Sequence, residues 1–222
     1  MAPDKDLKLE GIIFDVDGTL ADTEEVHRIA FNRTFEEFGL AWRWSEEIYA
    51  DLLSISGGKE RLTAFGSDLR NEFQNDSIFH NFIAEMHIKK SENYRKLISE
   101  RKIKLRTGVR RLVMEGRSKK ISLNLATSSS FANIDTLLRP NFGSNWRELF
   151  HVIESSDTTK EKKPHPAVYE NVLKKSALNA SRVIAIEDTQ NGLDAACKAS
   201  LKTIVTIHPM TAKNSFDESS FV

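Results

Sequence analysis

The chain has 222 residues, of which 40% are apolar and 29% are charged, and its 32 basic side chains balance its 32 acidic ones. This balance leaves no net field to attract nucleic acid or an anionic membrane, so we expect neither as a partner. The single cysteine, Cys197, excludes an internal disulfide and argues against a cysteine–zinc site, which fits a cytoplasmic protein. No apolar run approaches the roughly 20 residues of a membrane helix.

The first predicted element is a short strand over Gly11–Phe14, an apolar run that stops at Asp15. A helix is expected to follow, with Asp22 as its N-cap and Glu25, three positions later, as the second half of a capping box. The apolar positions of this helix continue to Phe38, and Gly39 is expected to end it.

A long helical block is predicted next, reaching about Leu97. Its apolar residues recur at helical rather than alternating spacing, so no strand is expected there. A helical block after a single strand is an insertion rather than part of a regular alternation of strands and helices. We therefore expect a core domain of residues 1–21 and 98–222 that carries an inserted helical domain of residues 22–97.

Strands and helices alternate in the rest of the chain. Helices are expected over 109–117, 133–138, 166–175 and 191–199, and strands over 121–126, around 151–153, and over 183–186 and 203–206. This alternation predicts a parallel sheet that is covered on both faces, hence an α/β fold. The tail after His208 is polar and is expected to be irregular.

Polar residues follow four of the predicted strands. The first is followed by Asp15 and Asp17, the second by Thr127-Ser128-Ser129, the third by Lys162-Lys163 and the fourth by Glu187-Asp188. In open α/β sheets, ligands bind beyond the carboxyl ends of the strands, so these side chains are expected to share one site.

This set of side chains suits phosphoryl transfer. Carboxylates from two strands can hold Mg²⁺, which prefers oxygen ligands. A carboxylate can then attack phosphorus, while a lysine and a hydroxyl bind the phosphoryl oxygens. Gly18 would let the backbone approach the phosphate closely.

The segment Asp15-Val16-Asp17-Gly18-Thr19-Leu20 resembles the first motif of the haloacid-dehalogenase superfamily, and the other three motifs occur in order as Thr127, Lys163 and Glu187-Asp188. The helical insertion is similar to the cap of the β-phosphoglucomutase-like subgroup. Residues 22–28, 57–61, 161–164 and 187–193 resemble the CbbY-type phosphatases, which act on xylulose-1,5-bisphosphate. The resemblance covers nearly the whole chain and implies a Rossmann-like parallel-sheet core with an inserted α-helical cap domain.

By this resemblance, Asp15 is the nucleophile and Asp17 is the general acid and base, protonating the leaving alkoxide and then deprotonating water. The resemblance implies that Asp15, Asp188 and the backbone carbonyl of Asp17 hold Mg²⁺. Glu187 is expected to contribute indirectly or through water.

Thr127 and Lys163 are implied to bind the transferring phosphoryl group. Lys162 is the rival of Lys163, but the lysine next to the proline matches the motif. Ser128 and Ser129 compete with Thr127, since they can simply form a hydroxyl-rich turn. We place Thr127 first because it follows the strand directly, and Ser128 as a lesser phosphate contact.

Four residues of the predicted cap are candidate substrate contacts. His27 resembles the histidine that faces substrate in the subgroup, although a lone histidine is often structural. Glu24 beside it is also a favourable residue for the start of a helix. Lys59 and Arg61 form either an exposed basic turn or the binding site of a second, distal phosphate.

The function predicted first is a phosphatase for a small sugar phosphate, with a ketopentose bisphosphate favoured, acting as a monomer. A β-phosphoglucomutase-like mutase is the second hypothesis, because it would use the same aspartates. A non-catalytic binding protein is the third, although such a protein would be expected to have lost one of the motifs. A dehalogenase is disfavoured, since it would need neither Asp17 nor a metal.

Overall fold

A five-stranded parallel sheet forms the centre of the computed structural model, which describes residues 8–212 and 214–216. The strands lie in the order β3-β2-β1-β4-β5, with bounds β1 Gly11–Phe14, β2 Ser122–Ala126, β3 Val152–Glu154, β4 Val183–Glu187 and β5 Lys202–Val205. The predicted strands are confirmed to within a residue or two at each end. Because β1 pairs in parallel with both β2 and β4, the residues that follow these three strands meet at one edge.

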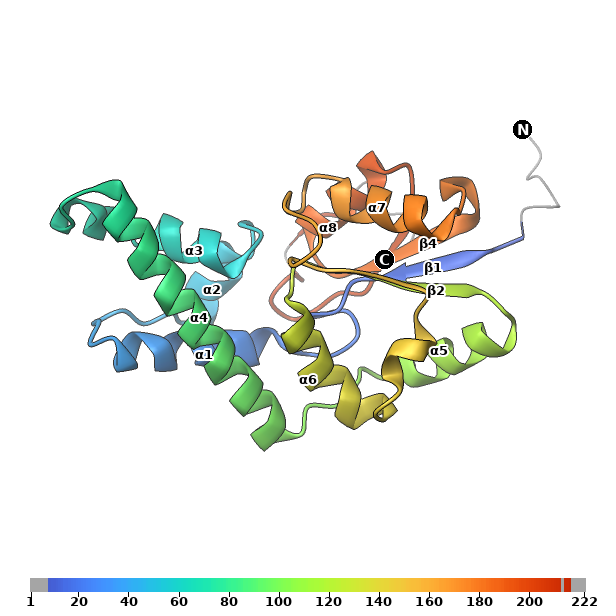
Figure 1. Cartoon of the computed structure of the whole chain (residues 1–222), viewed down its shortest axis with the longest axis horizontal. Coiled ribbons are helices and arrows are strands. Elements are labelled where there is room, and N and C mark those ends of the chain that lie inside the picture. Colours follow the sequence, from blue (N-terminus) through green and yellow to red (C-terminus); the bar gives the residue numbers. More distant parts are fainter. Residues whose placement is uncertain (1–7, 213, 217–222) are drawn as a thin grey trace.

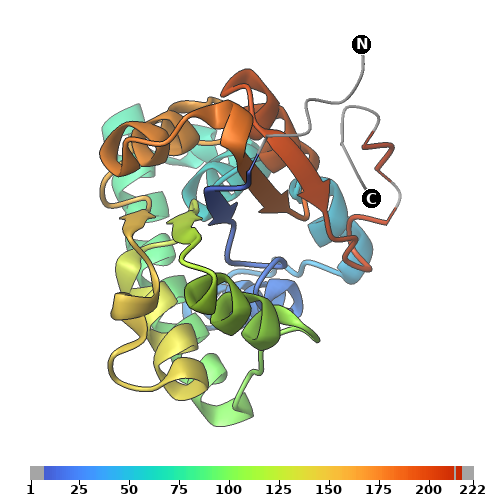
Figure 2. The ribbon, with the colours of Figure 1, turned by 90° about the vertical axis from the view of Figure 1, so that its right-hand side faces the viewer.

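Helices cover both faces of the sheet (Figures 1 and 2). One face carries α5 (Val109–Ser118) and α6 (Phe131–Phe142), and the other carries α7 (Ala167–Ser176) and α8 (Gln190–Lys198). Side chains of β1 alternate between the two: Ile12 and Phe14 pack with α5 and α6, whereas Ile13 packs with α7 and α8. Short 3₁₀ turns, Trp146–Leu149 and Ala180–Arg182, precede β3 and β4. The α/β fold class is confirmed.

The predicted helical insertion forms a separate block beside the sheet (Figure 1). It consists of α1 (Glu24–Glu37), α2 (Glu46–Leu52), α3 (Gly58–Phe65), a 3₁₀ turn (Ser67–Glu72) and α4 (Asp76–Arg101). These helices bury an aromatic cluster of their own, which contains Phe31, Phe35, Trp44, Tyr49 and Phe79. We refer to this block as the cap. Helix α4 continues beyond the expected limit at 97, and the domain limits of 22 and 97 stay a prediction.

The start of α1 differs from the expected capping box. The helix begins after Thr23, whose side chain does not cap it. The Thr23 hydroxyl instead donates to Asp17 Oδ1 at 2.8 Å, and Asp22 pairs with His208 Nε2 at 2.6 Å. Prediction of Asp22 as the N-cap was therefore wrong, because its side chain binds His208 instead of a backbone N–H group at the start of the helix.

The chain passes between sheet and cap at two adjacent points. Ala21 and Leu105 form an antiparallel bridge, and Arg106 N donates to Leu20 O at 2.8 Å. The Arg106 guanidinium donates to Gly18 O at 2.5 Å and to Thr206 O at 3.2 Å, which ties the loop after β1 to the segment after β5. Among the residues described, no helix is both long and apolar enough to cross a membrane.

Candidate active site

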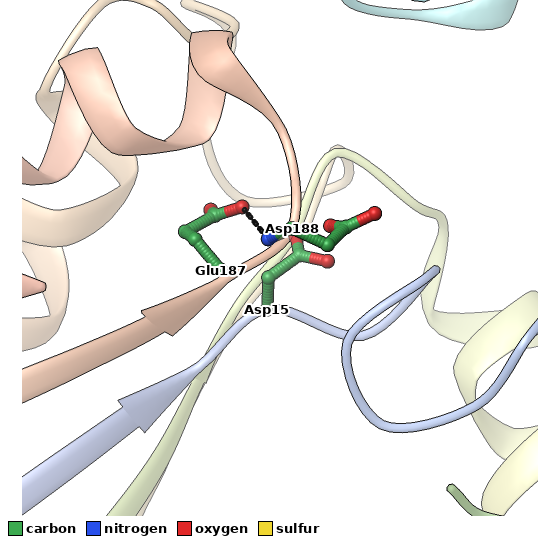
Figure 3. A group of neighbouring side chains, drawn as sticks. All are labelled: Asp15, Glu187 and Asp188. Carbon is green, nitrogen blue, oxygen red and sulfur yellow. Dashed lines mark hydrogen bonds between the residues drawn. The ribbon is translucent and has the colours of Figure 1, made fainter. Parts of the chain in front are cut away.

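Three carboxylates gather where β1 and β4 end (Figure 3). The carboxylate oxygens of Asp15, Glu187 and Asp188 lie within 4.8 Å of one another, and all three residues are buried. Lys163 reaches the cluster from the loop after β3, and its Nζ lies 2.6 Å from both Asp15 Oδ1 and Glu187 Oε1 and 2.9 Å from Ala126 O. The structure thus brings together the predicted first, third and fourth motifs.

Two glycines make room for this cluster. Gly18 has φ +81°, and a Cβ there would lie 2.0 Å from Asp188 Oδ2. A Cβ on Gly192, in the first turn of α8, would lie 2.0 Å from Glu187 Oε2. Larger residues at either position would push carboxylates out of the cluster.

Burial and crowding set the charge state of these acids. Burial raises the pKa of Asp15 well above its usual value; Lys163 opposes this rise and Glu187 adds to it. The pKa of Asp188 is also raised, by burial first and then by Asp15 and Glu187. Burial lowers the pKa of Lys163, but the two neighbouring carboxylates outweigh it, so that pKa is raised. A single ammonium group therefore faces three carboxylates, and the cluster has an excess of negative charge.

The donor set fits a hard divalent cation. Asp188 Oδ1 accepts a hydrogen bond from Thr19, at 3.2 Å, but its buried Oδ2 has no hydrogen-bond partner in the described part of the chain. Such an orphaned buried oxygen next to Asp15 suits a metal ligand, and carboxylate oxygens are what Mg²⁺ prefers. Glu187 is less available, because its carboxylate accepts hydrogen bonds from Lys163, Tyr169 and its neighbour's backbone N–H (Figure 3).

Asp17 faces the cap rather than the carboxylate cluster. Its Oδ1 accepts hydrogen bonds from Thr23 Oγ1 at 2.8 Å and from Tyr94 OH at 3.0 Å, and His27 Nε2 lies 3.0 Å away. Burial raises the pKa of Asp17, but His27 and hydrogen bonds from His27, Ser129 and Thr23 outweigh this effect and lower it. Asp17 is therefore a carboxylate at neutral pH, held by the start of α1 and by α4.

Lys90, on α4, contacts the other ring nitrogen of His27. Its Nζ lies 2.6 Å from His27 Nδ1, and its side chain is buried. Burial and Lys90 lower the pKa of His27, although Asp17 opposes them. Burial likewise lowers the pKa of Lys90 to about 7. With its ring proton on Nε2, His27 donates to Asp17 and accepts from Lys90 through Nδ1.

A second chain of contacts holds Arg61. The buried Glu24 accepts a hydrogen bond from Tyr49 OH at 2.7 Å, and Arg61 Nη1 donates to the same hydroxyl at 3.1 Å. Arg61 Nε also donates to Ile55 O at 2.8 Å. Arg61 lines the same pocket as Asp15 and Asp17, together with Glu24.

Cap and sheet domain contact each other directly across this pocket. Lys162 Nζ pairs with Glu60 Oε2 at 2.6 Å, Ser56 Oγ lies 3.4 Å from Ser128 Oγ, and Asn191 Nδ2 donates to the backbone O of Ser54 at 2.8 Å. All three contacts involve residues 54–60 of the cap. The structure therefore has the cap closed over the strand ends.

Most, but not all, of the predicted site residues line the pocket. Thr127 and Ser128 do so, and Thr127 Oγ1 also accepts a hydrogen bond from Ser129 N at 3.1 Å. Lys59 is exposed and is absent from the pocket wall. Lys162, the rival of Lys163 in the sequence, also lines the pocket and forms the ion pair with Glu60.

Sequence reasoning missed the side chains of α4. The helix places Ile83, Met86, Lys90, Tyr94 and Leu97 on its buried face. A lysine within an otherwise apolar stripe was a signal that could have been found, because an unpaired buried lysine is costly and needs a partner. Nothing in the local sequence indicated that the partner is His27.

A family profile described as haloacid dehalogenase-like hydrolase matches residues 12–206. The chain belongs to this family. The protein is therefore an enzyme, and among the haloacid dehalogenase-like hydrolases it is a phosphatase. The motif-based prediction of the family is confirmed.

Individual relatives agree with the predicted subgroup. Protein CbbY from Cereibacter sphaeroides is 42% identical over 198 residues, which is 89% of this chain and 84% of that protein. A crystal structure of a variant CbbY from Rhodobacter sphaeroides, in complex with xylulose-1,5-bisphosphate, has a TM-score of 0.87 at 38% identity and covers 96% of this chain and 93% of its own. A structure described as putative β-phosphoglucomutase from Thermotoga maritima has a TM-score of 0.70 at 25% identity, covering 96% and 93%.

Proposed function

We propose that the protein is a Mg²⁺-dependent phosphatase that hydrolyses a small sugar phosphate through an aspartyl-phosphate on Asp15. The observation that carries this proposal is the arrangement at the strand ends. Asp15 lies 2.6 Å from the Lys163 ammonium, beside the unpartnered Asp188 oxygen, and Asp17 lines the same pocket. A nucleophile, a cation for the phosphoryl group, a metal ligand and an acid–base residue thus converge.

In the first step, a carboxylate oxygen of Asp15 bonds to phosphorus while the bond from phosphorus to the sugar oxygen breaks. Asp17 gives its proton to that oxygen, so that the sugar leaves as an alcohol. Lys163 offsets charge on the phosphoryl oxygens. Without ligand, Asp17 is ionised, and we infer that the charge of a bound phosphate raises its pKa toward the protonated form.

In the second step, Asp17 takes a proton from a water molecule, whose oxygen attacks phosphorus. The bond from phosphorus to Asp15 breaks, inorganic phosphate leaves, and both aspartates return to their starting states. Thr23, His27 and Tyr94 all contact Oδ1 of Asp17, and we infer that Oδ2 is the oxygen that transfers the proton.

Asp15 and Asp188, with the backbone carbonyl of Asp17, would hold Mg²⁺. When bound, this ion neutralises charge on the carboxylates and on the phosphoryl oxygens. Without this ion, Lys163 would be the one ion-pair partner of Asp15 among the described residues. We therefore expect activity to require added Mg²⁺ and to disappear with a chelator.

A sugar bisphosphate, with xylulose-1,5-bisphosphate favoured, is the proposed substrate. The support is the 38% identical CbbY structure that contains this compound, together with Arg61 on the opposite wall of the pocket. Arg61 is anchored through Nε and Nη1, so its planar guanidinium is already oriented for a second phosphate.

The test is a phosphate-release assay over sugar monophosphates and bisphosphates, with and without Mg²⁺. A phosphatase releases inorganic phosphate from at least one of them. A mutase instead yields an isomeric sugar phosphate and little free phosphate, and a binding protein yields neither product. Either of these outcomes would overturn the proposal.

A further inference from the structure

His87 lines the active-site pocket but has no part in the mechanism above. It lies on α4, one turn before Lys90, and shares the pocket wall with Gly58, Arg61 and Lys162. His80, seven positions earlier, lies on the same helix. The structure separates the two, because His80 is exposed outside this pocket and His87 is half-buried within it.

The ring of His87 is unpaired within the described part of the chain. The hydrogen bond recorded at this residue uses its backbone carbonyl, which accepts from Ser91 Oγ at 2.9 Å. A neutral imidazole offers one N–H donor and one acceptor nitrogen. A half-buried polar ring that faces a pocket and lacks a partner is available to a ligand.

Gly58 leaves space for this ring. A Cβ at Gly58 would lie 2.9 Å from His87 Nε2 and 3.2 Å from the Phe31 ring. Gly58 is the first residue of α3, the helix that carries Arg61 one turn later. The imidazole therefore packs directly against the turn that positions Arg61.

The surroundings of His87 are cationic. Its pKa is lowered to about 3, by burial first and then by Lys90, Lys162, His27 and Lys59, with no acid among the main contributors. The ring is thus neutral at neutral pH in a region of positive potential. Such a region attracts an anionic group, and a neutral N–H can donate to an anionic oxygen there.

We propose that His87 is a specificity-determining residue that donates a hydrogen bond to an anionic oxygen at the end of the substrate remote from the reacting phosphate. Gly58, which has no Cβ, provides the space that the His87 ring occupies. This inference rests on the proposed function, since it presumes a substrate with a second anionic group.

The test compares xylulose-1,5-bisphosphate with the two corresponding monophosphates. His87→Ala lowers kcat/KM for the bisphosphate by about tenfold or more, mainly through KM, as expected for losing a hydrogen bond to a charged group. Its kcat/KM for the monophosphates stays within about twofold of the wild-type value. His87→Gln keeps a donor and recovers part of the loss. His80→Ala, on the same helix, is the matched control and leaves both activities unchanged.

Gly58→Ala provides a second, independent variant. Its Cβ displaces the His87 ring and lowers bisphosphate activity, but adding it to His87→Ala costs little more, because the ring is already gone. Equal losses on bisphosphate and monophosphates, or no loss on either, overturn the inference while the phosphatase function stands. If wild-type protein releases no phosphate from any of the three compounds, the proposed function itself is wrong. Thermal unfolding of each variant checks that the fold is intact.

Discussion

The two walls of the active-site pocket are built on different principles. The sheet wall concentrates negative charge: three buried carboxylates share one ammonium group, and one carboxylate oxygen is unpartnered in the part of the chain that the structure describes. The cap wall carries Lys90, His27, Arg61 and His87, and its acid Glu24 is bound by Tyr49. The sheet wall suits a metal and a covalent intermediate, whereas the cap wall suits the rest of a polyanionic substrate. Chemistry and selectivity should therefore be separable by mutation.

The largest effect is expected at the sheet wall. Asp15→Asn should remove turnover on every substrate, because an amide is a far weaker nucleophile and the change also removes one charge from the metal site. Loss of a nucleophile typically costs many orders of magnitude in rate. Steady-state phosphate release with Mg²⁺, and thermal unfolding to show an intact fold, measure this. Appreciable release by a clean Asp15→Asn preparation would refute the covalent mechanism.

Asp17 lies between the two walls, and its substitution should reduce activity to an extent that depends on the leaving group of the substrate. Asp17→Asn should lower turnover of sugar phosphates by about 10²- to 10⁴-fold, the usual contribution of general acid–base catalysis. Aryl phosphates should lose less, because their leaving groups need little protonation. Mg²⁺ binding, followed by titration calorimetry, should change little, since the proposed metal contact is the backbone carbonyl. Equal losses on sugar and aryl phosphates would count against the acid role.

A change in the cap wall should affect selectivity instead. Arg61→Ala should reduce kcat/KM on a sugar bisphosphate by roughly 2–4 kcal/mol in transition-state binding, as expected for lost charge-assisted hydrogen bonds. A small monophosphate should be turned over almost normally. Lys59→Ala is a matched control two positions away, because Lys59 is exposed outside the pocket.

The outcomes of this comparison are distinct. Similar losses on both substrates would mean that Arg61 supports cap structure through Tyr49 and Ile55 rather than binding phosphate. A loss in Lys59→Ala equal to that in Arg61→Ala would place the distal phosphate nearer the surface than we propose.

The smallest expected effect concerns stability and comes from Lys90. Its pKa is about 7 in the folded protein against 10.5 normally, so between these values the folded state binds fewer protons than the unfolded state. The stability of the wild type therefore rises with pH across this window and falls again as the pH drops toward 7. Lys90→Met removes this dependence. The free energy of unfolding of the variant, relative to that of the wild type, should therefore be larger at pH 7 than at pH 10. Urea unfolding at both pH values measures this.

Lys89→Met is the control for this prediction. Lys89 is the preceding residue of α4, and its side chain is 43% exposed. It should show no comparable change in relative stability between the two pH values. Parallel pH dependences for wild type and Lys90→Met would mean that the buried lysine keeps a normal pKa.

The sheet wall could be predicted from sequence, and the cap wall could be predicted only in part. Asp15 and Thr127 directly follow strands, Glu187 ends β4 and Lys163 lies in the loop after β3, and a parallel sheet brings such positions to one edge whatever the details of packing. The cap has no comparable rule. Which helix face meets the pocket depends on how α1, α3 and α4 pack on one another, and the contact of Lys90 with His27 spans 63 positions.

The start of α1 was mispredicted for a related reason. A capping box is a local pattern, and Asp22 and Glu25 satisfy it in the sequence. In the structure, Asp22 pairs with His208, a tertiary contact that overrides the local preference, and Glu25 pairs with Arg28 in the next turn of the same helix. Side-chain caps do form where the capping residue has only local partners, as with Ser45 and Asn75, which cap α2 and α4.

The bridge between Ala21 and Leu105 has a consequence for how such a protein can change. Residues opposed in an antiparallel pair have Cα atoms about 4.5–5.5 Å apart, a gap that a two-residue turn spans. The whole segment between them is therefore a cassette whose ends are already joined in space. Another segment could replace it without moving Asp15, Lys163 or Asp188. The same catalytic residues could then act on new substrates after exchange of this one segment.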